Sequence, residues 1–167
     1  MIARVTLGAG VLLLLTGCTA APGPLRIDHD VAQCIPSDTY DDVLVGVSLE
    51  NPGDTDVTIT DLTFPTLEGV DVAEAWLVDP DPQDDGTTLG YGVEEYPIDA
   101  STRPRWDDRV PAVGATLAAD HTAFIALHLR HVDPDALVEG VSVSYRLGDA
   151  LHTVESNIRV EFSSAGC

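Results

Sequence analysis

The sequence has no lysine, a single methionine at its first position and no apolar run of the roughly 20 residues that a membrane-spanning helix needs. Its 8 basic residues are all arginines, against 28 acidic residues, and the formal net charge is −20. Such an acidic chain lacks the electrostatic attraction that drives binding to nucleic acid or to anionic lipid. A copper site with a thioether ligand is also excluded, because no methionine follows position 1.

Motifs of the common catalytic classes are missing as well. There is no G-x-S-x-G nucleophile turn, and the stretch GYGVEE at residues 90–95 lacks the third glycine and the following helix of a phosphate-binding loop. With 28 acidic residues, a pair of carboxylates carries no information about a glycosidase. His128 and His131 lie three apart on a predicted strand, so they face opposite ways and cannot share a metal ion. We therefore predict neither an enzyme nor a cofactor.

The N-terminus carries a targeting pattern. Arg4 precedes an apolar segment at residues 5–15, which ends in Leu15-Thr16-Gly17-Cys18. This stretch resembles the lipobox of bacterial lipoproteins, a leucine and two small residues before an invariant cysteine. The alternative is an ordinary signal peptide with a chance cysteine.

The resemblance implies a lipid anchor at Cys18. In that class the thiol takes a diacylglyceryl group, cleavage removes residues 1–17, and the new amine can be acylated, for example with palmitate. Two or more acyl chains hold a protein stably on a bilayer. We expect residues 18–32, with their prolines and small side chains, to be a flexible tether, and the protein to lie on the extracytoplasmic side of the cell membrane.

Two further cysteines remain, Cys34 and Cys167. An even pair in an exported chain predicts a disulfide, which would join the first and last strands of the domain. The alternatives are two free thiols or a bond to another chain.

Residues 33–167 show an apolar period of two that is typical of strands. The strongest segments are residues 42–51, 57–64, 70–78, 122–131, 140–149 and 151–162, with a weaker one at 88–98. We expect residues 43–64 to form a hairpin and residues 133–140 to form a single helical turn. Seven or eight short strands predict a single all-β domain, a two-sheet antiparallel immunoglobulin-like sandwich, with a small β-barrel as the alternative.

Two irregular stretches, residues 79–87 and 99–115, are expected at the ends of the sandwich, where binding surfaces form. The second contains Trp106 beside Arg103, Arg105 and Arg109, a composition typical of partner-binding sites. The competing interpretation, which we favour, has Trp106 covering the core while the arginines pair with nearby acids.

The first stretch holds four aspartates, Asp79, Asp81, Asp84 and Asp85. Calcium prefers such clustered oxygens, but no register fits an EF-hand loop. They are weak metal candidates, and an exposed acidic loop is the default interpretation.

Together these observations predict a lipoprotein whose domain is a non-catalytic binding module of the cell envelope. Its partners would be the bilayer, through Cys18, and another envelope protein or a cell-wall component. One alternative is a small envelope hydrolase or divalent-metal-dependent enzyme built from the acidic loops. A structural spacer is the other, and it shares every sequence feature of the binding module.

Overall fold

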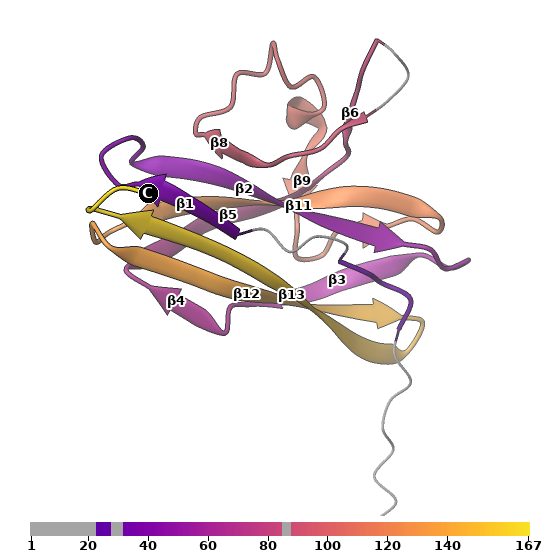
Figure 1. Cartoon of the computed structure of the whole chain (residues 1–167). Helices are drawn as coiled ribbons and strands as arrows, with labels where there is room; N and C mark the ends of the chain where they lie inside the picture. The colour runs from indigo at the N-terminus through magenta and orange to yellow at the C-terminus, as the bar shows by residue number, and fades with distance from the viewer. Residues whose placement is uncertain (1–22, 28–31, 85–87) are drawn as a thin grey trace, which may run out of the picture.

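The computed structural model describes residues 23–27, 32–84 and 88–167, which are largely β-strand (Figure 1). The strands of five or more residues are β1 Ala32–Pro36, β2 Asp42–Asn51, β3 Val57–Thr63, β5 Val70–Val78, β11 His121–His131, β12 Ala136–Leu147 and β13 Ala150–Ser163. The shorter strands are β4 Thr66–Glu68, β6 Asp81–Pro82, β7 Thr88–Leu89, β8 Val93–Glu95, β9 Val110–Pro111 and β10 Thr116–Leu117. A 3-10 turn, η1, covers Trp106–Asp108. No helix in the described part of the chain is both long and apolar enough to cross a membrane.

Two sheets make up the body of the molecule. One has five strands in the order β8-β2-β11-β5-β9, and the other has the order β1-β13-β12-β3-β10 with β4 also paired to β12. Alternate residues of each strand point between the sheets, as Val43, Val45, Val47 and Leu49 of β2 do, and none of these four is more than 1% exposed. The predicted all-β, two-sheet sandwich is confirmed.

We had expected a purely antiparallel sandwich, but one of its strand pairs is parallel. Strand β1 runs parallel to β13, with Cys34 opposite Glu161. Both strands run toward the end of the molecule where the chain terminates, and Cys34 and Cys167 form a disulfide there. The predicted pairing of these cysteines is therefore confirmed.

The predicted hairpin at residues 43–64 is wrong. Strand β2 pairs with β11 and β8, whereas β3 pairs with β12 and β10, so the turn between β2 and β3 carries the chain from one sheet to the other. Asn51 explains the crossing. It is fully buried, and its side-chain amide donates to the carbonyls of Thr55 (3.0 Å) and Ala118 (2.9 Å). These bonds hold the turn against the neighbouring connection and direct it across the sandwich.

The helical turn expected at residues 133–140 is also absent. Strand β12 already begins at Ala136, and Ala136 and Val138 both point into the core. Pairing of β12 with β4 and β13 satisfies the backbone hydrogen-bond donors and acceptors here. A strand therefore forms, although the local sequence has the capping pattern of a helix.

The segment between β5 and β9 forms a second layer. We had expected its irregular stretches at the ends of the sandwich, but the described part of residues 79–109 folds over the outer face of the five-stranded sheet (Figure 1). A second apolar cluster lies beneath it, made of Leu44, Trp76, Val78, Tyr91, Trp106 and Ala126. The part of this sheet that lies beneath the second layer is therefore buried on both faces.

The N-terminal part of the fold starts earlier than predicted. Residues 18–32 were expected to be a tether, but Leu25 is only 4% exposed and belongs to the main core. Arg26 forms an antiparallel bridge with Glu50 of β2, through two backbone hydrogen bonds of 2.9 Å. Residues 23–27 are therefore part of the sandwich.

Candidate functional site

Trp106, the aromatic candidate for partner binding, lies inside the second layer. It is 5% exposed and packs edge-to-face on Trp76, with 5.2 Å between ring centroids. The Arg109 guanidinium stacks over both rings, 4.4 Å from that of Trp106 and 5.1 Å from that of Trp76. These contacts support the structural interpretation of Trp106.

Arg103 is buried in an ion-pair network. Its Nη1 lies 3.4 Å from Asp81 Oδ2, its Nε donates to Glu94 Oε2 at 3.0 Å, and its Nη2 pairs with Glu94 Oε1. Burial alone would lower the pKa of Arg103, but the hydrogen bond and charge of Glu94, followed by the charge of Asp81, raise it overall. Arg103 stays charged and joins two parts of the covering segment.

Tyr91 lies beneath this network, with the Arg103 guanidinium 4.7 Å from its ring centroid. Burial, and then the charge of Asp81, raises the pKa of Tyr91 far above its usual value.

Arg105 is the exposed member of the arginine set, and its side chain pairs with exposed Asp108 at 3.4 Å. The four predicted partner-binding residues therefore divide: Arg103 and Trp106 are buried, Arg109 is half-buried and Arg105 faces solvent.

The aspartates of residues 79–87 have separate partners. Asp79 pairs with His121 at 3.0 Å, and Asp84 is exposed. Asp81 is fully buried, and besides pairing with Arg103 it accepts the backbone N–H of Arg105 at 2.7 Å. Asp85, like the lipidation candidate Cys18, lies outside the described residues. Nothing in the described part of this loop draws its carboxylates toward a common point.

Of the three histidines of β11, His128 and His131 face opposite sides of their sheet, as predicted. His128 stacks on Tyr96 with 3.9 Å between ring centroids, on the outer side. His131 stacks on Phe162 of the other sheet at 4.9 Å. Within residues 23–27, 32–84 and 88–167, no group of three or more histidine, cysteine, aspartate or glutamate side chains is arranged to hold a metal ion.

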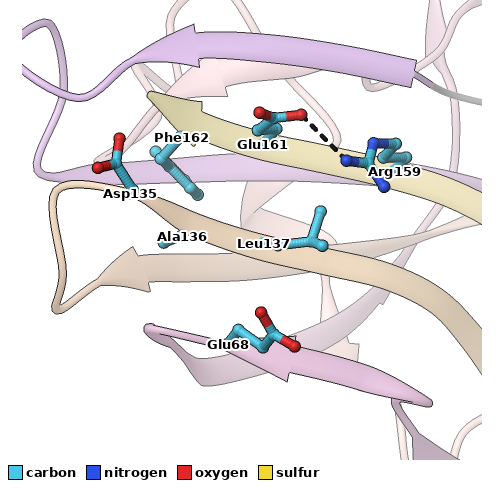
Figure 2. A pocket seen from close by; sticks show the side chains of 7 residues that line it. All are labelled: Glu68, Asp135, Ala136, Leu137, Arg159, Glu161 and Phe162. Carbon is cyan, nitrogen blue, oxygen red and sulfur yellow. Dashed lines mark hydrogen bonds and ion pairs between the residues drawn. The ribbon is translucent and has the colours of Figure 1, made fainter. Parts of the chain in front are cut away.

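A groove with a volume of about 270 Å³ lies on the outer face of the six-stranded sheet (Figure 2). It lies at the end of the sandwich that carries the disulfide. Its lining residues are Glu68, Asp135, Ala136, Leu137, Arg159, Glu161 and Phe162. Strands β4, β12 and β13 bring these side chains together, so the groove is assembled from segments far apart in the sequence.

Charge in the groove is arranged around Arg159. Its Nη1 donates to Glu139 Oε1 and its Nη2 to Glu161 Oε2, both at 3.1 Å. These two hydrogen bonds, that to Glu161 first, raise the pKa of Arg159. The lining carries three carboxylates and one guanidinium, so it is net negative by two. Sequence reasoning missed this site, because its residues come from three strands and are brought together only by the pairing of those strands.

Asp135 closes one end of the groove, where it holds the C-terminal tail. Its Oδ1 accepts the backbone N–H and the hydroxyl of Ser164, both at 2.8 Å. The backbone hydrogen bond first, and then that of the hydroxyl, lowers the pKa of Asp135. This carboxylate is therefore ionised throughout the physiological pH range.

No family model matches the chain, and no curated protein matches its sequence. Among solved structures, the ASH/PapD-like domain 7 of human CEP192 is similar to it at 14% identity and a TM-score of 0.43, over 93% of this chain and 96% of that one. The VesB protease of Vibrio cholerae is similar at 12% identity and a TM-score of 0.41, over 83% of this chain and 32% of that one. The secreted serine protease VesC from Vibrio cholerae is similar at 10% identity and a TM-score of 0.39, over 82% and 22%.

Proposed function

We propose that this protein is a membrane-anchored lipoprotein of the cell envelope, facing the extracytoplasmic side, and that its sandwich is a non-catalytic binding module. The resemblance of Leu15-Thr16-Gly17-Cys18 to a lipobox supports the anchor. The Cys34–Cys167 disulfide is in keeping with an oxidising, extracytoplasmic compartment.

The groove around Arg159 is the observation that carries the binding role. Among the described residues that line it there is no serine, threonine, cysteine or histidine to act as a nucleophile with its base. Instead it combines the half-buried apolar side chain of Leu137 with three carboxylates and one guanidinium. A mixture of this kind suits a protein or polymer surface, and the net negative charge favours a partner that carries basic groups.

Photocrosslinking in cells tests the binding role. A photoreactive residue replaces Leu137 in the groove or, as the control, Leu151, which is 60% exposed at the other end of the sandwich. We expect a discrete adduct from position 137 and none from position 151. The double substitution Glu68→Arg and Glu161→Arg, which changes the net charge of the lining from −2 to +2, should abolish the adduct with a basic partner while membrane attachment persists. Equal adducts from both positions would contradict binding at the groove.

Intact-mass measurement of the protein extracted from membranes tests the anchor. A lipid-sized increment on Cys18 is expected, and Cys18→Ser should release the protein from the membrane fraction. An unmodified Cys18 would overturn the proposed localisation.

A further inference from the structure

The N-terminal segment at residues 23–27 is held to the sandwich by several independent contacts. Leu25 is buried in the main core, and its backbone N–H donates to the Tyr145 hydroxyl at 3.4 Å. Arg26 is bridged to Glu50 by two backbone hydrogen bonds. A Cβ atom on Gly23 would overlap the Tyr145 hydroxyl, so the chain passes too close to this ring for any larger residue.

These contacts determine where the chain leaves the domain. Gly23 lies beside Tyr145 and His152, a cross-strand pair next to the β12–β13 turn, and Pro24 lies beside Gly53 in the β2–β3 turn. We call this the exit end. The opposite end carries the C-terminus, the disulfide and the β11–β12 connection (Figure 1).

The chain between Cys18 and Gly23 is short. Five Cα–Cα steps span at most about 18 Å, whereas a strand the length of β13, with 14 residues, rises by about 45 Å. A lipid on Cys18 therefore keeps the exit end close to the bilayer, while the far end can stand several tens of ångströms away. A flat orientation would bring much more of this acidic domain against an anionic surface, which is unfavourable because the chain has 28 acidic residues and 8 basic ones.

We infer that the docked segment 23–27 holds the domain upright on the membrane, with the exit end toward the lipid and the disulfide end, including the groove around Arg159, presented outward. This inference rests on the proposed lipid anchor at Cys18. It identifies the disulfide end as the surface available to an envelope partner, and the exit end as the surface that faces the bilayer.

Energy transfer from two labelled positions tests the orientation. Leu151, 60% exposed at the exit end, and Val132, 59% exposed at the far end, are each replaced by cysteine and labelled with a donor dye. The lipidated full-length protein is reconstituted into vesicles of phosphatidylglycerol and phosphatidylcholine that contain an acceptor lipid. We expect transfer from position 151 to be several-fold stronger than transfer from position 132. Equal transfer, or stronger transfer from position 132, would overturn the inference.

A longer tether provides the matched control. Insertion of about 15 glycine and serine residues between Ala21 and Pro22 leaves the fold intact but adds a coil of about 22 Å. Transfer from position 151 should then fall toward that from position 132. Failure of the anchor itself would appear differently, as an unlipidated protein that does not sediment with vesicles, and would overturn the proposed localisation together with the orientation.

Discussion

Asp81 and Arg103 lie against each other inside the second layer, with Asp81 Oδ2 3.4 Å from Arg103 Nη1 and both residues less than 10% exposed. One of them was a candidate metal ligand and the other a candidate partner contact, and they lie 22 residues apart in the sequence, one in each irregular stretch. The structure shows that each neutralises the other. The two stretches therefore form one covering layer.

Loss of the Arg103 charge should destabilise the protein strongly. The substitution Arg103→Met keeps most of the side-chain volume but leaves Asp81 buried without a counter-charge, which costs about 3–5 kcal/mol in comparable pairs. We expect a loss of this order in the free energy of unfolding, measured by denaturant titration. The control Arg105→Met removes a half-exposed charge and should change stability by less than about 0.5 kcal/mol. Equal effects of the two substitutions would contradict the network.

The sequence contained an indication of the second layer, although the period-two alternation of apolar residues did not by itself predict that layer. Strand β2 reads Val43-Leu44-Val45 without a polar residue between, and Leu44 is fully buried on the outer side of its sheet. Trp76 and Ala126 on the neighbouring strands are buried on the same side. Continuous apolar runs are typical of strands covered on both faces. What covers the outer face could not be predicted, because the covering segment is irregular and held by ion pairs between distant residues.

Leu25 should contribute to stability although it precedes the predicted domain. The substitution Leu25→Ala removes a side chain that is 4% exposed, and we expect the free energy of unfolding to fall by about 2–3 kcal/mol. Leu151→Ala, at an exposed site, should change it by less than about 0.5 kcal/mol. Thermal and denaturant unfolding of the version lacking residues 1–18 measures both. An unchanged stability for Leu25→Ala would show that residues 23–27 do not dock.

The disulfide should protect the β1 edge above all. Among the described strands, β1 pairs only with β13, and Cys34 and Cys167 are 133 residues apart in the chain. Replacing both cysteines by serine should lower the free energy of unfolding by about 2–5 kcal/mol. Amide hydrogen exchange should accelerate first in Ala32–Pro36, while β2 and β11, which lie in the other sheet, keep their protection. Uniform acceleration in both sheets would argue against a local role.

Alkaline pH should weaken the fold through its buried tyrosines. Burial raises the pKa of Tyr91 and of Tyr145 above 10.0, so the folded state retains these phenolic protons to a higher pH than the unfolded chain does. The free energy of unfolding therefore falls as the pH rises through about 10. Denaturant titrations across that range should show this slope, and Tyr91→Phe should reduce it. Tyr40→Phe, at a partly buried site, is the control, and an equal reduction by it would contradict the assignment.

For the groove, the sequence predicted the strands that form it but not which of their side chains line it. Its alternating outward residues, such as Glu139 on β12 and Arg159 and Glu161 on β13, match the predicted strand period. A bulge at Gly140, whose φ is 76°, shifts the register between Glu139, which lies opposite Arg159, and Val141, which lies opposite Ser156. Since a shift of one residue reverses the faces of a strand, the contents of the groove could not be predicted from periodicity alone.

Asp135 should keep the groove charged in acid. Its hydrogen bonds from the Ser164 backbone and hydroxyl hold the pKa of Asp135 below 3.8, and NMR titration of its carboxyl carbon measures this. Ser164→Ala removes only the hydroxyl bond, so the pKa should rise part of the way toward 3.8. Because the folded-state pKa is the lower one, the stabilisation is present above pH 3.8 and is lost as the pH falls through the folded value. A pKa unchanged by Ser164→Ala would show that the hydroxyl does not hold this carboxylate, and would leave the backbone N–H as its partner.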